Sequence, residues 1–302
     1  MTAVTPATNA ARARRWKFGA PASARQYSTL LSLALIAPLL LLLCFGFLYP
    51  VGRLLLGSLF VPDFTLANYA RLVSEPLYLG VLVRTFRIAL IVMCACFLLG
   101  YPVAYAMAKL QGRWAAFVAA CVLVPLWTSV LVRSYAWIVL LQRNGVVNNT
   151  LTSLGITDGP LRLIYTEGAV ILATAHVLLP FMILPIFGAL RSIPPELAQA
   201  ARNLGAGASG AFFRVTLPLS MPGVYAGCLM TFILALGFYV TPALVGGPGT
   251  LLMATLIGQQ TTELLDWPFA GALSAALLFS TLILVAVFRK ALSFNKGVAG
   301  GA

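Results

Sequence analysis

The amino-acid sequence predicts an all-α membrane protein that crosses the bilayer as six transmembrane helices, with both termini in the cytoplasm. Of its 302 residues, 61% are hydrophobic and only 9% are charged, whereas about a quarter of the residues in a soluble domain carry a charge. The seven acidic residues are too few to solvate a globule of this size. A soluble fold is therefore excluded.

Six apolar stretches approach or exceed the length of about 20 residues that a helix needs to cross the hydrocarbon core. They cover approximately residues 28–50, 87–108, 116–141, 169–190, 223–245 and 269–289. The first follows a basic segment, as in a secretory signal, but its apolar run ends at Tyr49-Pro50 without a small-residue cleavage site. We therefore expect a retained first helix, a transmembrane domain over 28–290, and cytoplasmic tails over 1–27 and 291–302.

The basic residues set the expected orientation. With the amino terminus inside, thirteen of the twenty Lys and Arg residues lie in the tails and inner loops, while six of the seven carboxylates lie on the outer side. The positive-inside rule then places both termini in the cytoplasm. The net charge of +13 is explained by this topology and by attraction to anionic lipid of the bilayer, so no nucleic-acid partner is expected.

The cysteines and the single histidine do not indicate a disulfide scaffold or a metal site. All five cysteines lie inside apolar blocks, where they are expected to be small core residues. His176 has no Cys, Asp or Glu three or four positions away that could share a metal ion. A hydrogen bond between helices is the expected role of its imidazole.

The inner loop 191–222 has a helical pattern, whereas the outer loops 51–86, 142–168 and 246–268 contain turn signals. Two prolines begin a run of good helix formers over 194–204, and a second segment, 209–217, precedes Pro218. We expect two short helices joined at the glycine-rich bend 205–208. Such a small, apolar element on a basic face is suited to dock a soluble partner.

Residues of this inner loop match a spaced signature: Gln199-Ala200-Ala201, Gly205, Val215 and Leu217-Pro218. In this respect the sequence resembles the permease subunits of binding-protein-dependent ABC importers. Gln199 stands where the family has glutamate, and Glu196 supplies a carboxylate one helical turn earlier. Four further segments are similar to the first permease of spermidine/putrescine importers: 64–69, 133–148, 179–185 and 237–247.

The resemblance implies a fold of the ABC importer permease type and a division of labour among subunits in a bacterial inner (plasma) membrane. This chain would pair with a second permease, bind an ATPase dimer through residues 196–218, and receive solute from an extracytoplasmic binding protein. ATP and magnesium would bind to the ATPase, so this chain is expected to be no enzyme and to hold no cofactor or metal; it contains no Gly-x-x-x-x-Gly-Lys-Ser/Thr motif. Spermidine or putrescine is the expected solute, with ferric iron, thiamine, sulfate and opines as alternatives.

Two clusters are candidates for lining the solute pathway. In the third expected helix these are Trp127, Thr128, Tyr135 and Trp137, and near the end of the fifth they are Tyr239, Thr241 and Pro242. Aromatic rings can hold an ammonium group by cation–π attraction. The alternative for the third helix is an aromatic belt with a snorkelling Arg133, and for the fifth a simple proline kink.

The spans themselves oppose two other classes of function. An ion-coupled secondary transporter normally needs a carboxylate within a span, and none of the six contains one. A membrane-embedded enzyme needs a nucleophile–base pair or a metal cluster, and His176 alone provides neither.

Gly223 and Gly227 form a Gly-xxx-Gly face that could pack within the chain or against a second permease.

Overall fold

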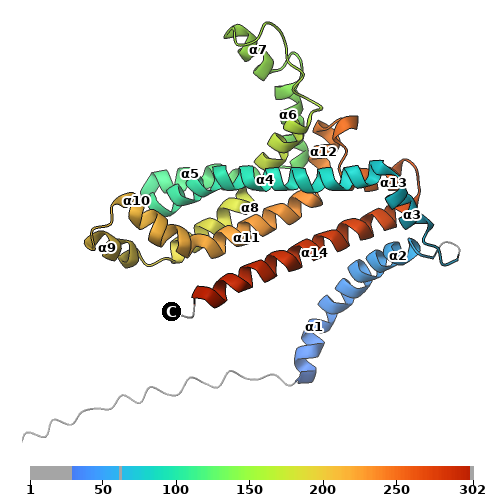
Figure 1. Cartoon of the computed structure of the whole chain (residues 1–302), viewed down its shortest axis with the longest axis horizontal. Helices are drawn as coiled ribbons and strands as arrows, with labels where there is room; N and C mark the ends of the chain where they lie inside the picture. The colour runs from blue at the N-terminus through green and yellow to red at the C-terminus, as the bar shows by residue number, and fades with distance from the viewer. Residues whose placement is uncertain (1–28, 61–62, 300–302) are drawn as a thin grey trace, which may run out of the picture. The chain divides into compact units, whose positions relative to one another are not determined.

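A computed structural model of the chain describes residues 29–60 and 63–299, which form helices and connecting segments without a β-sheet (Figure 1). The predicted basic tail 1–27 and the last three residues of the C-terminal tail lie outside this part. In chain order the helices are α1 (Thr29–Leu43), the π-helical η1 (Cys44–Leu48), α2 (Tyr49–Gly57), α3 (Ala67–Ser74), α4 (Pro76–Lys109), α5 (Gly112–Trp127), α6 (Val130–Leu141), α7 (Val146–Ser153), α8 (Glu167–Ser192), α9 (Pro195–Asn203), α10 (Ala208–Ala211), the π-helical η2 (Phe212–Thr216), α11 (Leu217–Leu236), α12 (Val240–Val245), the 3₁₀-helical η3 (Pro248–Thr250), α13 (Met253–Thr262) and α14 (Trp267–Ala299).

The chain divides into two compact units, one ending at Gly52 and one beginning at Arg53. The first contains α1, η1 and the start of α2. In η1 the N–H of Tyr49 bonds to the carbonyl of Cys44, five residues back, and Pro50 has no N–H to donate. Residues 33–57 of this helical run are long and apolar enough to cross a membrane.

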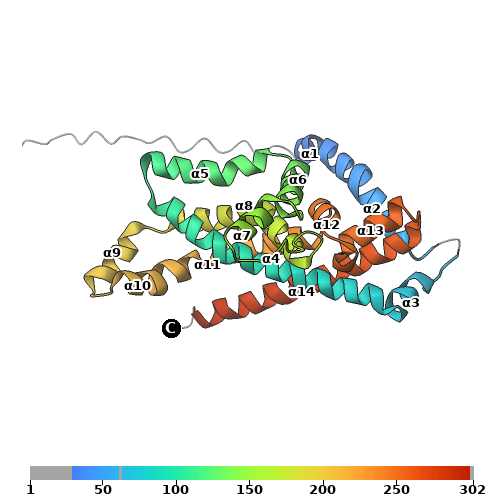
Figure 2. The same ribbon diagram turned by 90° about the horizontal axis from the view of Figure 1, so that it is seen from above.

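In the second unit α4, α8 and α11 run side by side and enclose the main core (Figures 1 and 2). Val92 and Cys96 of α4 pack with Met182 and Ile186 of α8, and all four are completely buried. Since the helices have no charged side chain in this core, van der Waals packing and small residues bring them together, as in other membrane bundles.

The Gly-xxx-Gly face belongs to the contact between α8 and α11. A Cβ atom on Gly223 would lie 2.5 Å from the Cβ of Ala189 and 2.6 Å from the carbonyl oxygen of Pro185. A Cβ on Gly227 would lie 2.9 Å from the carbonyl oxygen of Met182. Of the two alternatives left by the sequence, the structure therefore shows packing within the chain.

The third expected span, 116–141, is not one continuous helix. The model has two helices there, and the α5 direction is bent by 102° from that of the segment beginning at Val130. Thr128 and Ser129 between them have extended backbone, with ψ angles of 145° and 138°, and Pro125 lies in the last turn of α5. Within residues 29–60 and 63–299, five helices are long and apolar enough to cross a membrane, and the bent pair is a sixth only if it counts as one span.

The predicted fifth span, 223–245, also has different limits. Its helix begins earlier, at Leu217, and ends at Leu236 before a break over 237–239. The break comes from Gly237 and the two residues after it, since Pro242 lies in the first turn of α12, where a proline leaves no hydrogen bond unmade.

The inner loop follows the prediction in its first half only. Helix α9 forms where expected, but the segment 209–217 is not a separate short helix, because α10, η2 and α11 form one continuous helical run over Ala208–Leu236. The π-helical turn before Pro218 accommodates the missing N–H of that proline, since the N–H of Leu217 bonds to the carbonyl of Phe212.

The three loops that the sequence predicts on the outer side contain helices that turn signals alone did not predict. Helix α4 begins at Pro76, eleven positions before the expected start of the second span, because Glu75 has extended backbone and proline suits the first helical position. Helices α3, α7 and α13 lie in these three loops.

Candidate transport and coupling sites

The loop between α8 and α11 presents most of the predicted coupling residues at its surface. None of the residues of α9 is buried. Glu196, Gln199, Ala200, Gly205 and Pro218 are exposed, and the other predicted positions are half-buried: Ala201, Val215 and Leu217. Glu196 lies in the first helical turn, where its charge complements the helix dipole.

Gly205 turns the chain after α9 in a Schellman motif. Its φ angle is +88°, its N–H donates to the carbonyl of Arg202 at 2.9 Å, and the N–H of Ala206 donates to the carbonyl of Ala201 at 3.0 Å. This conformation costs a non-glycine residue energy. A Cβ at position 205 would meet no atom of this chain within 4 Å, so the requirement for glycine within the chain comes from the backbone and not from crowding.

Beside this turn, apolar side chains project into the surroundings. Leu204 is 89% exposed, and Leu197 and Phe213 are also largely exposed. Neighbouring exposed apolar side chains next to a bend of small residues are typical of a protein contact.

The pathway candidates of the third span are not brought together. Trp127 ends α5 and is 85% exposed, and the hydroxyl of Thr128 donates to the carbonyl of Pro125 at 2.8 Å. Tyr135 is exposed on α6. Trp137 is half-buried, and its indole N–H donates to Nδ1 of His176 at 3.2 Å. The expected interhelical hydrogen bond of His176 is therefore present.

Arg133 packs among the side chains around α6, and its interpretation as a snorkelling side chain stays a prediction. It is 9% exposed, and its Nε and Nη1 atoms have no hydrogen-bond partner among the described residues. Burial of an unpaired guanidinium is costly.

Of the candidates after the end of α11, two are buried and one is exposed. Thr241 is fully buried and shares a 2.8 Å hydrogen bond with Ser134, which joins α12 to α6, and Pro242 is buried beside it. Tyr239 is 46% exposed and lines an open, mostly apolar cavity of about 460 Å³ together with residues of α13 and α14. The break in the fifth span therefore borders a cavity.

Two groups of ionic contacts hold the segments around α3 and the start of α8, and neither was predicted from the sequence. Nη1 of Arg71 lies 3.1 Å from Oδ2 of Asp266, and its guanidinium stacks 4.1 Å from the ring centre of Phe269. Burial lowers the pKa of Arg71, but Tyr78 and Asp266 outweigh this effect and raise the pKa above its ordinary value.

The second ionic group joins the beginning of α8 to α4. Glu167 accepts a hydrogen bond from Nη2 of Arg87 at 2.6 Å, and Nε of Arg84 lies 3.5 Å from its carboxylate. The three-residue spacing of the two arginines puts them on one face of a helix, which is the signal that the sequence offered.

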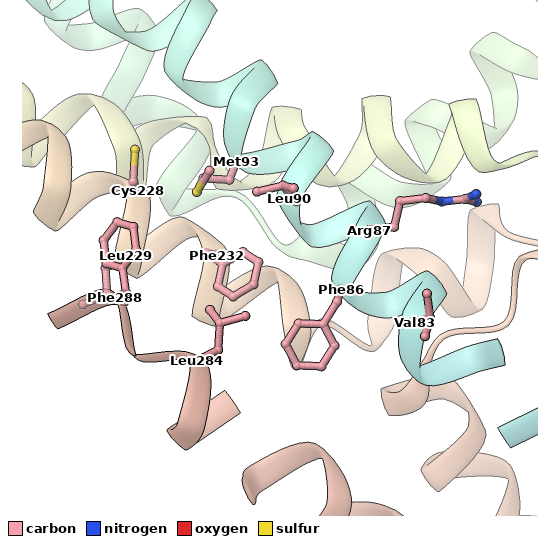
Figure 3. Close-up of a pocket in the computed structure, with 10 residues that line it drawn as sticks. All are labelled: Val83, Phe86, Arg87, Leu90, Met93, Cys228, Leu229, Phe232, Leu284 and Phe288. Atoms are coloured by element: carbon pink, nitrogen blue, oxygen red, sulfur yellow. The ribbon is translucent and has the colours of Figure 1, made fainter. Parts of the chain in front are cut away.

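An apolar groove of about 410 Å³ lies between α4, α11 and α14 (Figure 3). Phe86, Phe232 and Phe288 line it with other apolar side chains, while Arg87 at its margin directs its guanidinium away from them. A groove without polar lining offers no hydrogen bond to a polar solute and suits hydrocarbon.

The described segments offer no evident metal site. They contain no group of three His, Cys, Asp or Glu side chains placed to hold a metal ion. That this chain binds no cofactor stays a prediction.

Comparison with known proteins agrees on one family. Residues 98–293 match the family model described as "Binding-protein-dependent transport system inner membrane component". The chain is 39% identical over 236 residues to the spermidine/putrescine transport system permease protein PotB of Escherichia coli, an alignment that covers 78% of this chain and 86% of that protein.

Two solved structures share the fold. One is a bacterial ABC transporter involved in the import of the acidic polysaccharide alginate, with a TM-score of 0.73 and 18% identity over 88% of this chain and 95% of that one. The other is a bacterial alginate ABC transporter in complex with an alginate pentasaccharide-bound periplasmic protein, with a TM-score of 0.72 and 17% identity over 85% and 92%.

Proposed function

Because the chain belongs to the family of binding-protein-dependent transport system inner membrane components, we propose that it forms the translocation path of an ATP-driven importer for a polyamine, spermidine or putrescine. The chain is a multi-pass inner-membrane protein and a transport subunit, not an enzyme. The observation that carries the proposed solute is the 39% identity to a spermidine/putrescine permease over 78% of this chain.

We propose that residues 196–218 couple this chain to a separate ATPase dimer, which binds the ATP and magnesium. The exposed α9, the turn at Gly205 and the projecting Leu204 support this assignment. A short helix with alanines at its surface can enter a groove closely, and Leu204 can bury its side chain there. This chain itself would hold no cofactor.

The proposed topology has six spans, with the bent α5–α6 pair as the third, and both termini in the cytoplasm. The excess of basic residues in the tails and in the α9 loop supports it. The transmembrane domain would then extend over 28–290, with the cytoplasmic loop 191–222 facing the ATPase.

Two further partners belong to the proposal. A second permease, similar but not identical, would complete the path, and an extracytoplasmic binding protein would deliver the solute to the outer side. The structural neighbour that is in complex with a periplasmic protein supports the latter.

Along the path we assign solute contact to the exposed candidates Trp127, Thr128, Tyr135 and Tyr239, and to the half-buried Trp137. Thr241 and Pro242 would act by holding α12 in place, since both are buried.

A second candidate is the import of an anionic solute such as sulfate. Arg133 on α6 is the observation in its favour, since a guanidinium attracts a sulfate or carboxylate oxygen and repels an ammonium group.

Uptake into membrane vesicles tests these candidates. The permease would be produced with its partner subunits, and labelled spermidine and labelled sulfate would be offered with and without ATP. We expect ATP-dependent spermidine uptake that persists when an ionophore collapses ion gradients. Uptake of sulfate alone would replace the polyamine by the anion, and uptake driven by an ion gradient without ATP would refute the importer.

A further inference from the structure

We infer that the cavity at the end of α11 is a binding subsite for an ammonium group of the solute. The inference rests on the proposed import of a polyamine and adds to it a place and a set of contacts. Gly237 and Tyr239 form one side of the cavity, one face of α13 forms another, and Leu277 of α14 completes it.

The face of α13 that lines the cavity carries two hydroxyl groups whose protons are engaged. Oγ1 of Thr261 donates to the carbonyl of Gly258 at 2.9 Å, and Oγ1 of Thr262 donates to the same carbonyl at 2.8 Å. While these bonds are made, both oxygens offer lone pairs to a further partner. An N–H donor fits the oxygens in this arrangement.

The ends of two helices add negative potential at the same place. Helix α11 ends at Leu236, next to Gly237, and α13 ends at Thr262. The last carbonyls of a helix lack intrahelical partners and carry a partial negative charge that favours cations. Both ends therefore favour a cation in the cavity.

Tyr239 supplies an aromatic face, and Gly258 determines where that face lies. A Cβ on Gly258 would come within 2.5 Å of Cε2 and 3.2 Å of the hydroxyl oxygen of Tyr239. The ring can occupy this position only because residue 258 has no side chain. Ammonium groups bind the faces of aromatic rings by cation–π attraction.

The cavity is also suited to release what it binds. None of the described residues that line it carries a charge, so no ion pair would hold the ammonium group. A transport path needs sites that bind strongly enough to admit the solute and weakly enough to let it leave.

The test measures ATP-dependent uptake of labelled spermidine by the complete importer in vesicles, together with the amount of permease that copurifies with the ATPase. Tyr239→Leu removes the ring and Tyr239→Phe keeps it. We expect Tyr239→Leu to lower the uptake rate at least about fivefold and Tyr239→Phe to stay within about twofold of wild type, since the ring face is what binds. Gly258→Ala should lower uptake like Tyr239→Leu, because it displaces the ring.

Two matched controls separate this site from general damage. Tyr49→Leu removes a tyrosine that is 57% exposed, comparable with Tyr239, in the first candidate span. Thr281→Val removes a hydroxyl that also donates to a carbonyl of its own helix, but outside the cavity. Both should leave uptake within about twofold of wild type, whereas the exposed Thr262→Val should lower it.

The outcomes distinguish a failure of the proposed function from a failure of the subsite. If the wild-type importer takes up no spermidine, the proposed function fails and the subsite fails with it. If the wild type takes up spermidine but Tyr239→Leu and Thr262→Val behave like their controls, the subsite alone is wrong. If Tyr239→Leu no longer copurifies with the ATPase, the spermidine uptake rate of Thr262→Val decides whether the subsite exists.

Discussion

Glycines in two regions of the molecule have contrasting environments, one tightly packed and one open. On α11, Gly223 and Gly227 face α8 so closely that a Cβ atom would come within 3 Å of backbone atoms. After α9, Gly205 has open space around it but a φ angle of +88°. The first two positions require the absence of a side chain, whereas the third requires a backbone conformation.

Glycine is therefore required for helix packing in one region and for a backbone turn in the other. At the α8–α11 contact a substitution separates two membrane helices and should affect folding. At the exposed turn it should affect the shape of the loop and leave the bundle intact. Stability and coupling can therefore be separated by experiment in one chain.

The largest effect should come from Gly223→Val. Its methyl groups would overlap the Ala189 side chain and the Pro185 carbonyl, and overpacking of this kind costs about 3 kcal/mol or more where backbone must move. We expect little folded protein after detergent extraction, measured by size-exclusion chromatography. Gly188→Val is the control, because a Cβ there meets nothing within 4 Å. Equal yields for both variants would contradict the claim that close packing requires glycine at position 223.

The second effect should be loss of coupling in Gly205→Leu. A left-handed backbone costs a side-chain-bearing residue about 1–2 kcal/mol, and leucine also adds bulk at the proposed ATPase surface. We expect normal insertion but loss of copurification with the ATPase or of solute-stimulated ATP hydrolysis.

Gly205→Asn sharpens this result, because asparagine tolerates the left-handed conformation. Partial recovery by asparagine would assign the requirement to the backbone. Failure of both variants would assign it to close contact with the partner, and wild-type behaviour of Gly205→Leu would remove the loop as the coupling element.

A smaller effect is expected where the packed region uses a hydrogen bond instead of close contact. Ser134→Ala removes the partner of the buried Thr241 hydroxyl, and hydrogen bonds between membrane helices contribute about 0.6 kcal/mol on average. We expect a decrease of a few degrees in the thermal midpoint of the purified protein. The double variant with Thr241→Val should recover part of it, and a decrease as large as that of Gly223→Val would contradict this order.

The smallest effect should be that of Gln199→Glu. The side chain is exposed on α9, and an added carboxylate near Glu196 changes only a solvent-accessible charge. ATPase copurification and spermidine uptake should stay within about twofold of wild type. A strong loss would show that position 199 lies against a surface where charge is excluded.

Local sequence signals predicted the features that depend on neighbouring residues. The start of α9 at two prolines and the turn at Gly205 are of this kind, and both are present. The segment 239–242 signals an interruption near the end of the fifth span, and the structure has the break next to it, at residues 237–239. The break in the third span has no such signal, because hydropathy follows composition and is insensitive to extended residues such as Thr128 and Ser129.

The site residues missed by the sequence depend on long-range packing. Arg133 is buried only by the packing of α6 within the second unit. Gly258, Thr261 and Thr262 have no distinguishing pattern in the sequence, and they belong to one cavity only because Tyr239 packs against Gly258. No pattern within either segment alone could have joined them.

The uninterrupted helical run from Ala208 to Leu236 makes the two proposed sites mechanically dependent. Its 29 residues form a rod of about 43 Å at 1.5 Å per residue. One end follows the turn at Gly205, and the other borders the cavity beside Tyr239. A tilt of about 10° about the loop end would sweep the far end through about 7 Å, a lever-arm displacement comparable with the width of an ammonium group and its shell of contacts.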